Sequence, residues 1–172
     1  MKRLFTLAAF VSLAGCADTP LAPESAATNR KLATTLGREV DAAIVTMRRA
    51  TDRYHRIEVA RNDGFVLLHP CEVRPDEGPV GIVYVNFARL LDGVIDPALP
   101  DALIYEPGPN GTEKLVGVEF AVLAAPGQDP PTYLGNVFQL EEEFGVFALH
   151  AWVWKSNPEG MFAESNPRVS CS

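Results

Sequence analysis

Hydrophobic and polar positions alternate most regularly between Val146 and Trp154. Every second residue from Phe147 to Val153 is apolar, which predicts a β-strand with that face against a core. The other face is amphipathic and carries one of the three histidines and both tryptophans of the chain: Val146, Ala148, His150, Trp152 and Trp154. This strand therefore faces either a second core or a site.

A different period governs residues 30–62, where apolar residues recur at alternating spacings of four and three. The stripe is made by Leu36, Val40, Ala43, Met47, Ala50, Tyr54 and Ile57. It predicts one long helix that ends at Asn62-Asp63-Gly64, where glycine can cap the last turn. Three heptads favour packing on the protein's own sheet over a partner helix, which is the alternative.

Short strand-like segments with turn residues between them fill the rest of the chain. They cover residues 65–69, 81–87, 102–106, 114–123, 133–140 and 146–154. Asn110-Gly111 predicts a hairpin between the third and fourth, because both residues tolerate positive φ. The fold class expected is α+β: one long N-terminal helix packed on a curved, mainly antiparallel sheet or partial barrel, within a single domain over residues 30–172.

The N-terminus predicts export. Met1-Lys2-Arg3 precedes ten mostly apolar residues, a run too short to span a bilayer, so residues 1–15 are interpreted as a signal peptide. Leu13-Ala14-Gly15-Cys16 resembles the lipobox of bacterial lipoproteins, which implies cleavage before Cys16 and lipidation of its thiol. Residues 16–29, rich in small and polar residues, then form a flexible tether.

The lipobox also implies a location in the bacterial cell envelope. In enterobacterial lipoproteins an aspartate directly after the lipidated cysteine retains the protein in the inner membrane. Here that position is Ala17, which favours the outer membrane.

The net charge of the chain limits the classes of partner that it can bind. The chain has 15 Lys and Arg against 22 Asp and Glu, and removal of Lys2 and Arg3 with the signal leaves 13 against 22, a net charge of −9. A protein this acidic is a poor candidate for binding nucleic acid. Its expected membrane contact is the lipid on Cys16 and not anionic headgroups.

Two cysteines remain after Cys16. In an oxidising compartment Cys71 and Cys171 predict a structural disulfide closing a loop of about 100 residues. The alternative is a pair of metal ligands or a reactive thiol, but the chain has no Cys-x-x-Cys and no metal-ligand spacing.

Polar residues in the middle of otherwise apolar strands are the candidates for a ligand site. If the strands are neighbours, one face collects Tyr84, Asn86, Glu119, His150, Trp152 and Trp154. We hypothesise a shallow aromatic ligand site with one acid and one base, because burying such groups without partners is costly. The structural alternative is a hydrogen-bonded Glu–His pair with packed tryptophans. Finding Glu119 and His150 on opposite sides of the sheet would rule the site out.

Metal binding and other cofactor chemistry have weaker support. Candidate metal ligands are His69, Glu119 and His150, with Glu72 or Glu106 in reserve, but no two histidines are at helical or hairpin spacing. The sequence has no Gly-x-Ser-x-Gly, no P-loop and no dinucleotide fingerprint, so no cofactor is indicated.

Residues 64–171 resemble a group of uncharacterised secreted bacterial proteins. The segments that carry the resemblance are Gly81-Ile82-Val83-Tyr84-Val85-Asn86, Leu103-Ile104-Tyr105-Glu106-Pro107, Leu115-Val116-Gly117-Val118-Glu119-Phe120, Leu149-His150-Ala151-Trp152, Asn157-Pro158-Glu159-Gly160-Met161-Phe162 and Asn166-Pro167-Arg168-Val169-Ser170-Cys171. The resemblance implies one secreted domain without an assigned activity. Members carry histidine where this chain has Ile82 and Val83, which weakens a metal site here.

The function expected is a lipid-anchored envelope module that binds a small ligand or an envelope partner through the His150–Trp154 face. One alternative is a metal-dependent or acid/base hydrolase that uses Glu119 and His150. Another is a structural protein that self-associates through its helix or an edge strand. A concave pocket with convergent polar groups favours the first two, and an exposed apolar helix stripe favours the third.

Overall fold

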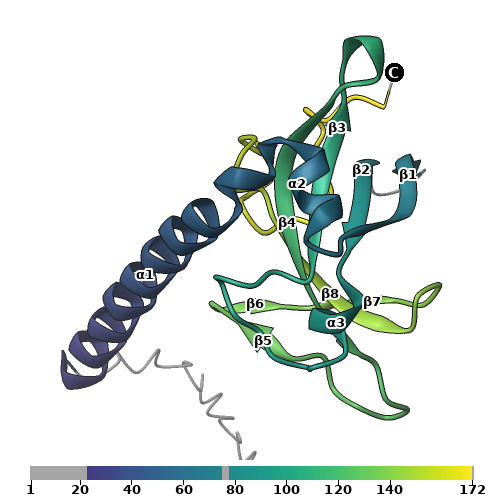
Figure 1. Ribbon diagram of the computed structural model, residues 1–172. Coiled ribbons are helices and arrows are strands. Elements are labelled where there is room, and N and C mark those ends of the chain that lie inside the picture. The colour runs from purple at the N-terminus through teal and green to yellow at the C-terminus, as the bar shows by residue number, and fades with distance from the viewer. Residues whose placement is uncertain (1–22, 75–77, 172) are drawn as a thin grey trace, which may run out of the picture.

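The computed structural model describes residues 23–74 and 78–171. It has the predicted α+β architecture, with a long helical segment packed against a curved, antiparallel six-stranded half-barrel (Figure 1). The predicted signal peptide, the lipidation site at Cys16 and the first part of the tether, up to residue 22, lie outside the described residues.

The expected single helix is divided into three elements. These are α1 (Pro23–Thr51), the 3₁₀ turn η1 (Asp52–His55) and α2 (Ile57–Asn62). The break follows from Arg56, whose extended backbone (φ −101°, ψ 107°) cannot continue a helix. The predicted stop is confirmed, since Gly64 takes φ 91°. The start differs, because residues 23–29, expected in the tether, are helical.

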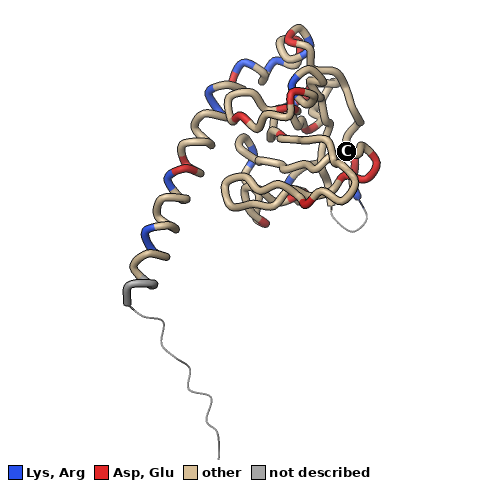
Figure 2. Tube along the Cα trace, turned by 90° about the horizontal axis from the view of Figure 1, so that it is seen from below, with Lys and Arg blue, Asp and Glu red and all other residues tan. Residues whose placement is uncertain are grey.

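The apolar stripe of α1 is buried only toward its C-terminal end. Ala43 and Met47 pack in the core, as does Tyr54 in η1, whereas Leu36, which lies near Gly135, is 37% exposed and Leu32 is 68% exposed. The first half of α1 projects from the rest of the chain in two views (Figures 1 and 2). On the N-terminal side of Leu36, Leu32 is almost the whole apolar surface that α1 presents to a partner helix. The stripe therefore does not favour self-association.

The large sheet has the strand order β1-β2-β3-β4-β8-β7, and every neighbouring pair is antiparallel. Its strands are β1 (Val66–Arg74), β2 (Gly78–Val85), β3 (Ala102–Pro107), β4 (Glu113–Leu123), β7 (Gln139–Glu141) and β8 (Val146–Ala151). The short helices α3 (Phe87–Leu90) and η2 (Pro109–Gly111) lie in the β2–β3 and β3–β4 connections.

The predicted hairpin is confirmed, with Asn110 at φ 58° and Gly111 at φ 74° between β3 and β4. The predicted strand over residues 133–140 is wrong as a single strand. Positive φ at Leu134 and Gly135 folds its first part into a separate hairpin, β5 (Thr132–Tyr133) with β6 (Asn136–Val137), and only β7 joins the large sheet.

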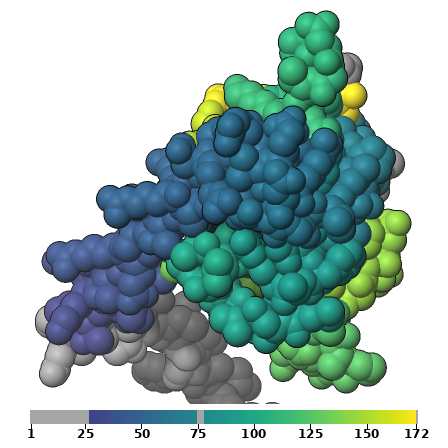
Figure 3. Space-filling model, viewed as in Figure 1, coloured from purple at the N-terminus to yellow at the C-terminus, as the bar shows by residue number. Residues whose placement is uncertain are grey.

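Each face of the large sheet is buried in its own cluster. On the helix face, Tyr105, Phe120 and Leu149 pack with Met47 and Tyr54, and η1 and α2 form a layer in front of the strands in Figure 3. On the opposite face, called the inner face here, the cluster is Val80, Val83, Val85, Leu90, Ala102, Ile104, Val116, Ala121, Val146, Ala148, Trp152 and Val169.

The two edge strands of the sheet are joined across the inner face. Arg74 of β1 donates two hydrogen bonds to the carboxylate of Glu141 in β7, at 3.1 and 2.9 Å. The ring of His69 in β1 stacks on Phe144, which follows β7. Because residues from both edges meet there, the sheet curves around the inner face.

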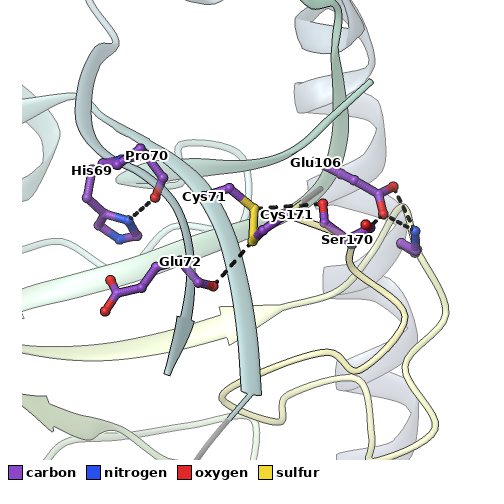
Figure 4. Close-up of a disulfide and its surroundings, with 8 residues drawn as sticks. His69, Pro70, Cys71, Glu72, Glu106, Ser170 and Cys171 are labelled. Atoms are coloured by element: carbon purple, nitrogen blue, oxygen red, sulfur yellow. Dashed lines mark hydrogen bonds and ion pairs between the residues drawn. A yellow bond between two sulfur atoms is a disulfide. The ribbon is translucent and has the colours of Figure 1, made fainter. Parts of the chain in front are cut away.

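The predicted disulfide is confirmed and fastens the C-terminal tail to β1. Cys71 and Cys171 are bonded, with 5.3 Å between their Cα atoms. Beside the bond, Glu106 accepts hydrogen bonds from the Lys155 ammonium (2.6 and 2.7 Å) and from the backbone N–H of Ser170 (2.8 Å), as Figure 4 shows. Glu106 is therefore a structural anchor for the tail.

Candidate functional site

Glu119 and His150 face one another on the inner face. They are directly paired in the β4–β8 register, and His150 Nε2 lies 3.4 Å from Glu119 Oε2. Both side chains are largely buried, with 8% of Glu119 and 5% of His150 exposed. The condition that would have ruled out the site is thus not met, since acid and base lie on the same side.

His150 is held as a hydrogen-bond donor. Its Nδ1 contacts the carbonyl oxygen of Glu164, which can only accept, so Nδ1 carries a proton. Burial lowers the pKa of His150, but the hydrogen bond and charge of Glu119, helped by the Glu164 carbonyl, outweigh burial and raise that pKa. The imidazolium form is favoured, which suits an acid or a counter-ion better than a general base.

Trp152 shares the inner face with this pair but is packed. Its ring lies against Gly117, where a Cβ would come within 3.3 Å of it, and 5.8 Å from the His150 ring between centroids. The indole Nε1 donates to the carbonyl of Ala163 at 2.6 Å, and only 1% of the residue is exposed. Trp152 is thus a packed neighbour that supports the His150 ring.

The prediction that Tyr84 joins this face is wrong. Tyr84 pairs with Leu103, which pairs with Val118, so all three point to the helix face. There the Tyr84 hydroxyl accepts a hydrogen bond from Arg61 (2.7 Å) and donates one to Glu113 (2.9 Å). Burial is the main cause that raises the pKa of Tyr84. Tyr84 ties α2 to the sheet.

Asn86 and Trp154 are also away from the pair. Asn86 caps α3 by accepting from the N–H groups of Ala88 and Arg89, and its amide donates to the carbonyl of Asp63. Trp154 lies beyond the end of β8, where alternation stops, and its Nε1 donates to Thr51 Oγ1 at the end of α1. Of the six predicted residues, the fold brings together Glu119, His150 and Trp152.

The predicted metal set is not assembled. Within residues 23–74 and 78–171 no group of three or more His, Cys, Asp or Glu side chains is arranged to hold a metal ion. His69 does line a small hollow with Glu119 and His150, but its ring is stacked on Phe144. Of the reserve ligands, Glu106 is bound by Lys155, and Glu72 is exposed at the edge strand (Figure 4).

An apolar pocket of about 200 Å³ opens beside Glu119. Its floor and walls include Leu90, Ala121 and Phe144, and every residue that lines it other than Glu119 is apolar. Three rim side chains are unusually exposed for their type: Phe87 at 49%, Leu91 at 65% and Leu123 at 55%. Exposed apolar residues gathered around a hollow mark an interaction site, whereas scattered ones do not.

Two further hollows border the pair. One of about 10 Å³, enough for one water molecule, lies between Glu119, His150 and Glu141. The other, of about 180 Å³, is lined by His150, Glu164 and Phe162 on the side of the C-terminal loop. The Glu119–His150 pair therefore separates an apolar pocket from a more polar one.

Asp101 is a buried acid that cannot be singled out from its position in the sequence, because it follows Pro100 at the end of a loop. It is 1% exposed, and its Oδ2 accepts a hydrogen bond from the backbone N–H of Ala121 at 2.9 Å. Burial raises its pKa to about 6, and the nearby charge of Glu119 adds to the rise. Asp101 therefore contributes negative charge behind the pocket above that pH.

Fold and site together define a disulfide-bonded half-barrel whose inner face holds an apolar pocket lined on one side by an acid. Comparisons of the chain with models of known protein families, with characterised proteins and with solved structures find no match. The resemblance to secreted bacterial proteins therefore stays a prediction, and the function has to be argued from the site.

Proposed function

We propose that this chain is a lipid-anchored protein of the bacterial envelope that binds a small ligand in the inner-face pocket. The observation that carries the binding proposal is the position of Glu119, whose carboxylate contacts His150 and also borders an otherwise apolar pocket. A carboxylate beside an apolar hollow costs solvation energy that a core of the same size would avoid. Retaining it there is understandable if a ligand uses it.

The lipid anchor is supported by the lipobox-like sequence and agrees with the shape of the chain. Six residues separate Cys16 from Pro23, and the 29-residue α1 is about 44 Å long. A helix of that length can hold the domain away from a lipid surface. The disulfide agrees with an oxidising compartment outside the cytoplasm. No helix in the described ranges, 23–74 and 78–171, has the length and apolarity needed to cross a membrane.

The anchoring proposal is tested by feeding radiolabelled palmitate to bacteria that produce the full chain. We expect label on the wild-type protein in the outer-membrane fraction, and no label with release into the soluble periplasm for Cys16→Ser. Ala17→Ser is the matched control and should still be labelled. An unlabelled wild-type protein would overturn the proposal.

The binding proposal is tested by filling the pocket. Ala121 lines it and is 5% exposed, so Ala121→Leu should occupy part of its volume. We expect 1-butanol to shift the methyl NMR signals of Leu91 and Leu123 in the wild-type protein and not in Ala121→Leu. Equal shifts in both proteins would show that the alcohol does not bind in this pocket.

Acid/base hydrolysis is the second candidate function. The 10 Å³ hollow beside Glu119 and His150 has room for one water molecule, which Glu119 could activate as a base while His150 acts as the acid. The raised pKa of His150 suits the acid role. A panel of ester and amide substrates tests this, with circular dichroism to check that each variant is folded. Activity lost in folded Glu119→Gln and folded His150→Gln supports hydrolysis, and activity unchanged in either variant contradicts it.

A further inference from the structure

We propose that the ligand of the inner-face pocket is a small amphipathic amine, with its alkyl or aryl group in the apolar part and its ammonium on Glu119. This inference rests on the proposed binding function and adds the chemical class of the ligand. It follows from the charges around the pocket, from its size and from the nature of its rim.

The first charge that a ligand in this pocket meets is the Glu119 carboxylate. Glu119 is the one charged residue among those that line the pocket, and His150 contacts the carboxylate from outside that lining. A ligand carboxylate would place two anions together in a partly buried site, which is unfavourable. An ammonium group would instead form a charge-assisted hydrogen bond with Glu119.

The surrounding charges do not cancel this preference. His150 offsets Glu119, but Asp101 lies close enough to influence it and is itself buried. Further along the inner face, Arg74 is already engaged by the carboxylate of Glu141. Arg74 also lies 3.7 Å from Glu164, and Asp101 is influenced in opposite directions by Asp92 and Arg89. Acids therefore outnumber bases around the inner face above the pKa of Asp101.

The apolar part of the pocket determines the size and the chemical nature of the ligand group that is not the ammonium. A volume of about 200 Å³ is below the range of drug-sized sites, which begins near 300 Å³, so one short chain or one ring fits. The walls from Leu90, Ala121 and Phe144 offer such a group no hydrogen-bond partner. The exposed side chains of Phe87 and Leu91 add apolar surface at the rim.

The test compares three probes of equal length and different charge: n-butylamine, 1-butanol and butyrate at pH 7.5. They are titrated into the full-length protein purified from bacterial membranes, and the methyl signals of Leu91, Ala121 and Leu123 report occupancy. We expect butylamine to bind most tightly and butyrate least. Glu119→Gln should weaken butylamine about tenfold to hundredfold, as expected for loss of a hydrogen bond to a charged group, and change butanol less than about twofold.

Two controls make the outcome specific. Glu142→Gln removes an equal charge from an exposed position outside the pocket and should leave all three affinities unchanged. Ala121→Leu, which keeps Glu119, should weaken binding of all three probes and so shows that they bind in this pocket. The order of the three affinities in the wild-type protein tests the amine class even if Glu119→Gln folds poorly.

The outcomes separate this inference from the proposal on which it rests. Butanol or butyrate binding in the pocket as tightly as butylamine would overturn the amine class and keep the binding function. An unchanged butylamine affinity in Glu119→Gln would also overturn the amine class. Absence of any shift with all three probes would overturn both.

Discussion

The side chains that form the site on the inner face also contribute to the stability of the fold. Glu119 and His150 each depend on the other, because a buried charge without a counter-charge is strongly unfavourable. Their mutual approach of 3.4 Å between β4 and β8 also holds the centre of the sheet together. Changes at this pair should therefore affect folding as well as binding.

Replacement of His150 by alanine should lower the free energy of unfolding by about 3 kcal/mol, because it leaves Glu119 buried without its partner. The raised pKa sets the pH dependence. Stability from a protonated histidine is complete below its unfolded pKa of about 6.5 and is lost as pH rises through the folded pKa. Urea unfolding at pH 5.5 and pH 9 measures this, with His55→Ala as a surface control. An equal cost for His150→Ala at both pH values would contradict the account.

Asp101 should add a second pH dependence over a lower range. Its pKa rises from 3.8 to about 6 on folding, so the folded state holds the proton more tightly and stability falls as pH rises from about 4 to 6. The shift corresponds to about 3 kcal/mol at most. Asp101→Asn, which mimics the neutral acid, should match the wild type at pH 4 and exceed its stability at pH 7.5.

The control for this measurement is Asp129→Asn, which removes an exposed carboxyl from a loop and should leave the pH profile unchanged. If Asp101→Asn destabilises the protein equally at pH 4 and pH 7.5, the acid is ionised in the fold throughout and the raised pKa is wrong.

At the scale of elements, register explains which parts of the site could be predicted. Alternation within each strand was informative: Glu119 and His150 were expected on one face and are paired there. The sequence does not specify how neighbouring strands align, and for that reason it does not reveal that Tyr84 points to the helix face. An extra residue at Val116, between Leu115 paired with Tyr105 and Gly117 paired with Ile104, also shifts the alternation in β4.

Breaks in regular structure were the other feature that limited prediction of the site from the sequence. Trp154 left the predicted face because β8 ends at Ala151, and the helix broke at Arg56 although the apolar stripe continues through it. Neither position carries proline or glycine, the residues from which a break can be read in a sequence. Where such residues are present, at Asn110-Gly111 and at Gly64, the prediction was correct.

Substitution of Gly81 tests how closely β2 and β3 are packed. Its φ is 105°, and a Cβ there would lie 2.7 Å from the carbonyl oxygen of Tyr105. Gly81→Ala should cost several kcal/mol, since both the backbone and the contact are strained. Gly127→Ala is the matched control, with φ 75° and open space, and should cost about 1 kcal/mol. Similar losses of stability in thermal unfolding would mean that β2 can move away from β3.

The disulfide is the second test at this scale. It joins residues 100 apart, so its removal should lower stability by up to about 4.7 kcal/mol through the greater entropy of the unfolded chain. Replacement of both Cys71 and Cys171 by serine, followed by urea unfolding, measures the loss. Glu106 and Lys155 still hold the tail in that variant, so it should remain folded. A change below about 1 kcal/mol would contradict this role of the bond.

On the scale of the whole molecule, α1 and the half-barrel have separate roles. The helix extends from the domain on the side where the chain continues toward Cys16, and the inner face lies on the opposite side of the sheet from η1 and α2 (Figure 1). Fold class and disulfide were predictable because they depend on periodicity and compartment. The pocket was not, because its walls come from four separate segments of the chain.

The most direct measurement of the central claim is a methyl NMR titration of the full-length protein with a deproteinised extract of bacterial envelope. We expect shifts at Leu91, Ala121 and Leu123 around the pocket, with Leu103 and Leu149 on the helix face unchanged, and no shifts around the pocket of Ala121→Leu. Shifts confined to the helix face, or shifts of Leu91 and Leu123 that persist in Ala121→Leu, would contradict the claim that the inner face is the ligand site.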